Sequence, residues 1–237
     1  LNKMCYEPLA MGIDLGTSGV RLALINKKLE LIYSSTTTYN NSLENCKDWE
    51  IACKKLILEI PKSIKSKIVS CSIDGTSGTI VACNKNGIPL GEAIAYHKSF
   101  NQNQKNISML ISNKIQGDFS SLGRALYLIK KFGNNILLRH QADWISSWLT
   151  SNWDLAEEGN NLKLGWNISK QSWPEAFKNQ PWKNALPCIQ KSGSILGQID
   201  IYKSKILGLP KNLLIIAGTT DSNAAVVATN ASKDDGI

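Results

Sequence analysis

Two apolar runs separated by a short polar turn, close to the start of the chain, constrain the fold most. Residues 9–13 and 20–25 are each long enough for a buried strand. The six residues between them read Asp-Leu-Gly-Thr-Ser-Gly, and two short apolar runs joined by a glycine-containing turn are typical of a β-hairpin. The sequence therefore predicts a hairpin whose turn carries one carboxylate and two hydroxyl groups.

This turn has the chemistry of a phosphate-binding loop. Gly16 and Gly19 permit a positive φ and let a ligand approach the main chain closely. Exposed N–H groups in such a turn form an anion-binding concavity, to which the Thr17 and Ser18 hydroxyls add donors. Asp14 would repel a phosphate unless a cation intervened, which suggests Mg²⁺ held through water. The alternative is an ordinary glycine hairpin whose aspartate bonds its own turn.

Two later motifs repeat this design, in which a buried strand ends in small polar residues. Residues 67–73 predict one such strand, followed by Asp-Gly-Thr-Ser-Gly at 74–78. Residues 213–217 predict another, followed by Gly-Thr-Thr-Asp-Ser at 218–222. Because ligands bind where strands end in open α/β sheets, we expect the three tips to meet in one crevice.

Asp221 is the candidate general base of this crevice. It follows a buried strand at the expected start of a helix over residues 223–230, and an ionised carboxylate there can take a proton from a hydroxyl group. The alternative is that Asp221 only caps the helix. Asp74 and Ser77 either bind a polyhydroxylated substrate or stabilise a glycine-bounded turn.

The rest of the chain predicts an α/β core interrupted by an insertion. Strands are expected at 30–36 and 79–83, and an amphipathic helix at 48–60. The insertion, about 97–190, is polar, with helices expected at 122–132 and 141–150, and the core comprises about 9–96 and 191–237. Six of the seven tryptophans lie in the insertion, where they either pack it or line a carbohydrate pocket.

Composition argues against several other classes of protein. The net charge is +8, but the lysines are scattered and not interleaved with aromatic residues, so no nucleic-acid groove is predicted. No apolar run approaches the ~20 residues of a membrane span. Six cysteines without a C-x-x-C pair favour a reduced, cytoplasmic setting, and two histidines exclude a His-rich metal site. Neither a P-loop nor a G-x-G-x-x-G fingerprint is present.

Several of these segments together resemble one protein family. Residues 12–18 resemble the first phosphate loop of the actin-like ATPase superfamily, which includes sugar kinases and heat-shock chaperone ATPases. Four further segments are similar to the N-terminal lobe of FGGY-type carbohydrate kinases, and more narrowly to the ribulose/xylulose kinase-like group of cyanobacteria and plants: 73–78, 142–144, 160–165 and 217–222. The resemblance implies an α/β, actin-like ATPase (ribonuclease H-like) domain, with a mixed central sheet flanked by helices and a Trp-rich insertion.

The resemblance also implies residue roles. Asp221 takes the position of the catalytic base that activates a sugar hydroxyl toward the γ-phosphate of ATP. Asp14 serves the Mg²⁺–phosphate centre and touches the sugar, while Gly16, Thr17 and Ser18 meet phosphate oxygens. The expected cofactors are ATP and Mg²⁺, and the expected partners are a small sugar and a C-terminal ATP-binding lobe that this chain lacks; the oligomeric state stays open.

The substrate follows less directly. The sugar site implied by the resemblance comprises Asp14, Asp74, Gly75, Thr76, Ser77 and Asp221. Gly75, Thr76 and Ser77 stand where better-known xylulose kinases carry a Met-His pair, and residues 95–98 replace a Trp-Asx-Asp-Arg-like sugar-binding segment. The expected substrate is a ketopentose, with D-ribulose ahead of xylulose. The alternatives are a kinase for another polyol such as glycerol, or a non-catalytic actin-like module that binds nucleotide or a partner.

Overall fold

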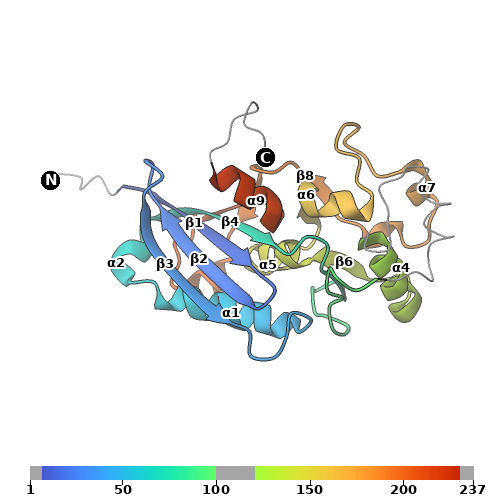
Figure 1. Cartoon of the computed structure of the whole chain (residues 1–237), viewed down its shortest axis with the longest axis horizontal. Coiled ribbons are helices and arrows are strands. Elements are labelled where there is room, and N and C mark those ends of the chain that lie inside the picture. Colours follow the sequence, from blue (N-terminus) through green and yellow to red (C-terminus); the bar gives the residue numbers. More distant parts are fainter. Residues whose placement is uncertain (1–6, 100–120, 230–237) are drawn as a thin grey trace.

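The computed structural model describes residues 7–99 and 121–229, and its largest element is a six-stranded mixed sheet (Figure 1). The strand order is β3-β2-β1-β4-β10-β9. Strands β1, β4 and β10 run parallel, whereas β2, β3 and β9 pair antiparallel with their neighbours. The strands span Leu9–Leu15 (β1), Gly19–Ile25 (β2), Leu31–Thr38 (β3), Ile68–Gly75 (β4), Ile195–Gln198 (β9) and Leu214–Ile216 (β10).

The two faces of the sheet differ in burial because side chains alternate along each strand. In β1, Leu9, Met11, Ile13 and Leu15 are buried, and together with the buried side chains of β2 they form the covered face. Helices α1 (Cys46–Glu59) and α5 (Gln141–Thr150) pack on this face. The remaining side chains of the two strands form the open face: Ala10, Gly12, Asp14, Arg21, Ala23 and Ile25.

Helix α1 shows how local sequence fixes an element of this core. Its apolar side chains recur at Trp49, Cys53, Leu56 and Ile57, a helical spacing that directs them to the covered face. Asn45 caps the helix by accepting a hydrogen bond from the Lys47 N–H, which accounts for a start two residues before the predicted one. The sequence-based prediction of a helix here is confirmed.

A second hydrophobic cluster lies beside the sheet, toward α4 and α7 (Figure 1). One small sheet, of β5 (Ile80–Cys83) with β6 (Leu137–His140), contributes side chains to this cluster. A second small sheet pairs β7 (Leu155–Glu157) with β8 (Cys188–Gln190). The other helical elements are α2 (Lys62–Lys65), α4 (Ser121–Phe132), α6 (Glu158–Asn161), η2 (Leu162–Leu164), α7 (Glu175–Lys178), η3 (Lys183–Ala185), α8 (Ile201–Leu207) and α9 (Asp221–Ala228).

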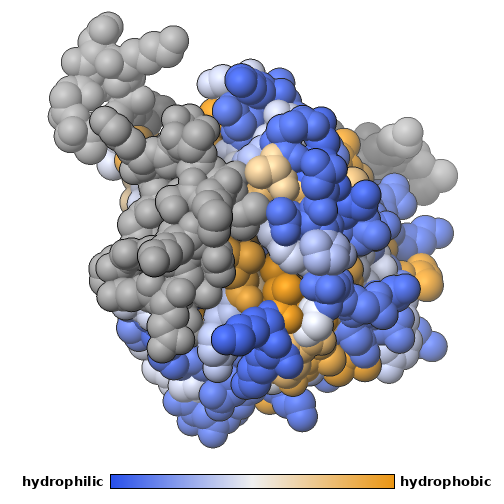
Figure 2. Space-filling view, turned by 90° about the vertical axis from the view of Figure 1, so that its right-hand side faces the viewer, coloured by the Kyte–Doolittle hydropathy of each residue, from blue (hydrophilic) through white to orange (hydrophobic). Residues whose placement is uncertain are grey.

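Tryptophan packing explains much of this second region. Trp182 and Phe177 are buried in the second cluster, Trp173 stacks on Phe177, and Trp166 meets Trp173 edge to face. Trp144 and Trp148 instead belong to the core beneath the sheet. Figure 2 shows the corresponding end of the molecule, where hydrophilic side chains surround a smaller apolar strip. These contacts favour packing over a carbohydrate-binding floor as the role of these tryptophans.

Contacts cross the boundaries predicted between the core and the insertion. Helix α5, which falls in the predicted insertion, packs on the six-stranded sheet, and β5, which falls in the predicted core, pairs with β6. The boundaries at 97 and 190 remain predictions. Across residues 7–99 and 121–229, no helix combines the length and apolar character needed to cross a bilayer.

Candidate active site

The polar carboxyl ends of three parallel strands lie next to one another at one end of the sheet. Since β1, β4 and β10 are parallel neighbours, their carboxyl ends point the same way. Asp14 lies directly opposite Asp74 in the β1–β4 register, and Gly75 forms a bridge with Thr220 just before Asp221. The expected meeting of residues 14, 74 and 221 at one edge therefore matches the strand arrangement, although Asp14 and Asp74 belong to strands and not to the turns after them.

Asp14 has a partner that the sequence reading missed. Its Oδ2 accepts a hydrogen bond from Arg21 Nη1 at 2.6 Å, within an ion pair whose arginine side chain is 73% exposed. The two residues face each other in the hairpin register. An ion pair this exposed contributes about 0–1 kcal/mol, so a ligand can displace it at little cost. A hairpin register counted outward from the turn would have revealed the pair.

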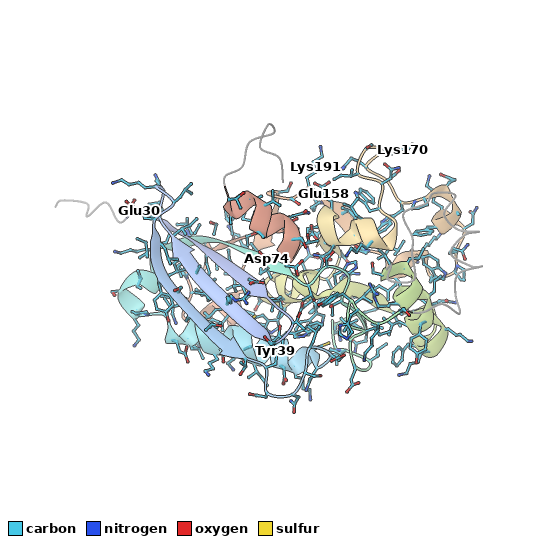
Figure 3. All side chains as sticks on the ribbon, in the orientation of Figure 1. Glu30, Tyr39, Asp74, Glu158, Lys170 and Lys191 are labelled. Atoms are coloured by element: carbon cyan, nitrogen blue, oxygen red, sulfur yellow. The ribbon has the colours of Figure 1, made fainter. Side chains whose placement is uncertain are left out.

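Asp74 lies in an electrostatically unfavourable position for a charged carboxylate. Its Oδ1 is buried and has no hydrogen-bond partner within the described part of the chain. Burial raises the pKa of Asp74 to about 7, and the negative charges of Asp14 and then Asp221 add to this rise. Figure 3 labels Asp74 where β4 ends beneath α9. A cation beside Asp14 and Asp74 would relieve the repulsion between their carboxylates.

These two carboxylates fit a magnesium ion held partly by water. Mg²⁺ prefers oxygen ligands and keeps several waters, so one or two carboxylates plus substrate phosphates can hold it. Asp14 is exchangeable and Asp74 has a free oxygen, as this mode requires. In residues 7–99 and 121–229, no group of three His, Cys, Asp or Glu side chains is placed to chelate a metal. The donor set therefore fits a water-mediated ion better than a closed metal site.

The hairpin turn exposes the hydroxyl-bearing residues Thr17 and Ser18 at its tip. Neither Gly16 nor Gly19 adopts the positive φ that glycine permits. Gly19 is needed for space instead, since a Cβ there would lie 2.2 Å from the Thr37 carbonyl oxygen. The turn is held by strand pairing and leaves both hydroxyl-bearing residues accessible to a ligand.

In the loop after β4, some residues are buried in the fold and Ser77 is partly accessible to a ligand. Thr76 is 2% exposed, and its hydroxyl lies 2.7 Å from both Thr79 Oγ1 and Gln141 Oε1. Its side chain is therefore committed to the fold. Gly75 is buried, whereas Ser77 is partly exposed and its carbonyl accepts a hydrogen bond from Lys163 Nζ at 3.3 Å. Of the hydroxyl-bearing residues in this loop, Ser77 is the better placed for a substrate.

Asp221 is the first residue of α9, but it is not the cap of this helix. Thr220 takes that role, because its hydroxyl accepts the hydrogen bond from the Asn223 N–H. Asp221 Oδ1 accepts from the Ser222 N–H at 2.7 Å and from its hydroxyl at 3.2 Å. The partly exposed carboxylate also interacts electrostatically with Asp74 and Lys163. The N-cap position of α9 is therefore occupied by Thr220, and the role of Asp221 as a general base stays a prediction.

A cavity of about 880 Å³ extends from these residues along the open face of the sheet. Asp14, Asp74, Gly218 and Thr219 line it at the strand tips, and Val227 and neighbouring α9 residues line it from the other side. Asp221 itself is not part of the lining. Gly218 lies so close to β4 that a Cβ would come within 1.8 Å of the Ile73 carbonyl oxygen, which keeps the two strand tips together.

Comparison with solved structures shows which known fold this is; no protein-family model matches the chain. Xylulose kinase from Lactobacillus acidophilus superposes with a TM-score of 0.80 at 16% identity, over 94% of this chain and 50% of its own. Xylulose kinase from Rhodospirillum rubrum gives 0.81 at 13% identity, over 95% and 51%. Glycerol kinase from Plasmodium falciparum, solved with ADP, gives 0.79 at 16% identity, over 94% and 50%.

These similarities establish the fold. The chain has the actin-like ATPase fold of carbohydrate kinases, with a mixed central sheet and flanking helices, as the sequence predicted. It spans about half the length of the kinases it matches.

Proposed function

We propose that this chain is the sugar-binding and catalytic-base lobe of an ATP-dependent carbohydrate kinase. The observation that carries the proposal is the set of three acidic residues, Asp14, Asp74 and Asp221, gathered at the ends of parallel strands in a carbohydrate-kinase fold. Phosphoryl transfer needs positioned charges more than covalent chemistry from the protein, and this edge of the sheet offers such charges.

In the proposed reaction, Asp221 accepts the proton of a sugar hydroxyl while that oxygen attacks the γ-phosphorus of ATP. The bond from the γ-phosphorus to the bridging oxygen breaks, and ADP leaves. Gly16, Thr17 and Ser18 contact phosphate oxygens at the exposed hairpin turn. Asp14 and Asp74 hold Mg²⁺, which neutralises phosphate charge when it is bound. General-base catalysis of this kind contributes roughly 10²–10⁴ to the rate.

For the acceptor we propose a ketopentose, D-ribulose first and xylulose second. Asp14, Asp74 and Ser77 present polar groups to the sugar, whereas Gly75 and the buried Thr76 shape the loop. Small residues at 75–77 leave room near the strand tip and supply no imidazole, which supports a preference different from that of xylulose kinases with a Met-His pair.

A second candidate acceptor is another polyol such as glycerol. This alternative rests on the glycerol kinase from Plasmodium falciparum, whose TM-score of 0.79 is nearly the same as the 0.80 of a xylulose kinase. Initial rates of ATP-dependent phosphorylation over D-ribulose, D-xylulose, glycerol and related polyols distinguish the two. A ketopentose preference requires the highest kcat/KM on D-ribulose, and a higher value on glycerol contradicts it.

A second lobe is needed to complete the site. The chain spans about half the length of the solved kinases, and transfer depends on groups that close on ATP from two sides. We therefore expect the isolated 237-residue chain to bind ketopentose weakly and to turn over little. A coupled ADP-release assay with the isolated chain checks this, and a rate of about ten per second, typical of complete enzymes, would contradict it.

We further propose a reducing, cytoplasmic location. Cys46, Cys53, Cys71 and Cys83 are buried as free thiols, and Cys188 is free and exposed. Chains that fold in oxidising compartments more often pair their cysteines.

The decisive test of the proposed function is the kcat of the Asp221→Asn variant, measured in the full-length encoded polypeptide. Loss of the base should lower kcat by about 10²–10⁴ with little change in stability. Asp200→Asn is the matched control, because Asp200 also stands at a helix start, where its side chain caps α8, and asparagine caps equally well. An unchanged kcat in Asp221→Asn would refute the base assignment. Absence of phosphorylation of any sugar or polyol by the unaltered polypeptide would instead favour a non-catalytic nucleotide- or partner-binding module.

A further inference from the structure

Helix α6 connects the two loops that carry the proposed sugar site. The Gly78 N–H, in the loop after β4, donates to Asn160 Oδ1 at 3.4 Å. Asn160 Nδ2 donates to the Thr219 carbonyl at 3.4 Å, in the turn after β10. Figure 1 shows α6 beside α9, whose first residue is Asp221. One side chain therefore links a residue adjacent to Ser77 with a residue two positions before Asp221.

The chemistry of this link suits an asparagine. A backbone N–H only donates and a carbonyl only accepts, so the two partners fix which end of the Asn160 amide faces each loop. Asn160 is 0% exposed, so water does not replace either hydrogen bond. An aspartate of the same shape could accept from Gly78 but could not donate to Thr219, and its charge would face a carbonyl oxygen.

The backbone around Asn160 is fixed by hydrogen bonds to the Glu157 carboxylate. Its backbone N–H donates to Glu157 Oε1 at 2.6 Å, and the Gly159 N–H donates to Glu157 Oε2 at 2.5 Å. The Glu157 N–H in turn donates to Asp143 Oδ1 at 2.9 Å, which ties this turn to α5. A Cβ on Gly159 would lie 2.9 Å from Thr219 Oγ1, so the α6 backbone lies directly against the turn after β10. Asn160 thus connects the two loops from a turn whose own backbone is fixed by hydrogen bonds.

Building on the kinase function proposed above, we propose that Asn160 is a positioning residue for phosphoryl transfer, which sets the spacing between the Ser77 loop and the Asp221 turn. Each hydrogen bond is long and contributes modestly to stability. The effect on catalysis is larger, because a displacement of about 1 Å between a base and its substrate can cost about 10²-fold in rate. Asn160 need not touch the sugar for this role.

The neighbouring Asn161 provides a matched control. It is 1% exposed, and its side chain donates to Asp143 Oδ2 at 3.0 Å and to the Glu157 carbonyl at 2.7 Å. It is thus equally buried and bonded, but it contacts neither site loop through these bonds. In the polypeptide as encoded, Asn160→Ala and Asn160→Asp should lower kcat about 10- to 100-fold with KM for ATP nearly unchanged. Asn161→Ala should lower the melting temperature comparably or more while kcat stays within about threefold.

A second readout does not depend on activity. Amide hydrogen exchange at Gly78, whose N–H donates to Asn160, should accelerate in Asn160→Ala and not in Asn161→Ala. Normal kcat in Asn160→Ala would overturn the inference whether or not Gly78 exchange accelerates, as would equal losses of kcat in the two alanine variants. If the unaltered protein phosphorylates no sugar or polyol, the proposed function fails, and with it the catalytic role of Asn160, while the Gly78 exchange still decides whether the link exists.

Discussion

The covered and open faces of the central sheet carry different kinds of side chain. In β1, the covered face presents Leu9, Met11, Ile13 and Leu15, each at most 3% exposed, whereas the open face presents Ala10, Gly12 and Asp14. The same strand thus supplies the apolar core on one side and small or charged residues beside a cavity on the other. Because adjacent residues point to opposite faces, stability and site chemistry can be varied separately along one strand.

The matched pair Ile13→Ala and Ile25→Ala tests this contrast most strongly. Ile13 is 2% exposed on the covered face, and its truncation should reduce the free energy of unfolding by about 2–5 kcal/mol. Ile25 is half-buried on the open face, so the same truncation should cost less than about 1.5 kcal/mol. Urea denaturation monitored by tryptophan fluorescence gives both values. Equal losses would mean that the two faces are equally buried in solution.

Two glycines provide a second matched pair, with a smaller expected effect. A Cβ at Gly218 would meet the Ile73 carbonyl oxygen at 1.8 Å, so Gly218→Ala should force β4 and the turn after β10 apart and cost about 1–3 kcal/mol. A Cβ at Gly12, on the open face, meets nothing within 4 Å. Gly12→Ala should therefore stabilise this chain by about 0.5–1 kcal/mol through reduced unfolded-state entropy. Thermal unfolding measures both changes, and destabilisation by Gly12→Ala would show that the open face is covered.

A third expected effect, smaller than that of Gly218→Ala, is the pH dependence of stability caused by Asp74. Its pKa rises from 3.8 to about 7 on folding, so the native state binds more protons than the unfolded state between these values. Stability should therefore fall as the pH rises from about 4 to about 7, by about 1–2 kcal/mol after allowance for partial exposure. Asp74→Asn should remove this loss, and so be more stable than the unaltered chain at pH 8 but not at pH 4. Parallel stability curves for the two proteins would contradict the assignment.

Local patterns in the sequence predicted much of the fold. The hairpin, α1, β4 and β10 follow from apolar periodicity and turn residues, which act over a few positions. Strand β9 and helix α8 lie in a segment with weaker patterning and were not predicted. Strand β5 was predicted, but its partner β6 lies more than fifty residues away, and no local signal indicated that pairing.

In the candidate site too, residues marked by local sequence patterns were predicted and residues that depend on long-range contacts were not. Asp14, Asp74 and Asp221 were predicted because each lies at the end of an apolar run. Arg21 was missed, and Asn160 was noted only within the segment 160–165, without a role. Their relevance depends on strand register or on contacts with residues about 60–80 positions away. Thr76 was assigned to the substrate, whereas burial commits its hydroxyl to Thr79 and Gln141.

By itself, the sequence determined the hairpin, α1, β4 and β10, and which of their strand ends carry acid or hydroxyl groups, because side-chain periodicity and turn conformation are local properties. Tertiary structure decided that β1, β4 and β10 lie side by side, that Thr220 and not Asp221 caps α9, and that Asp74 is buried against Asp14. These features depend on how distant segments pack, and packing sets the solvation and charge that each carboxylate experiences.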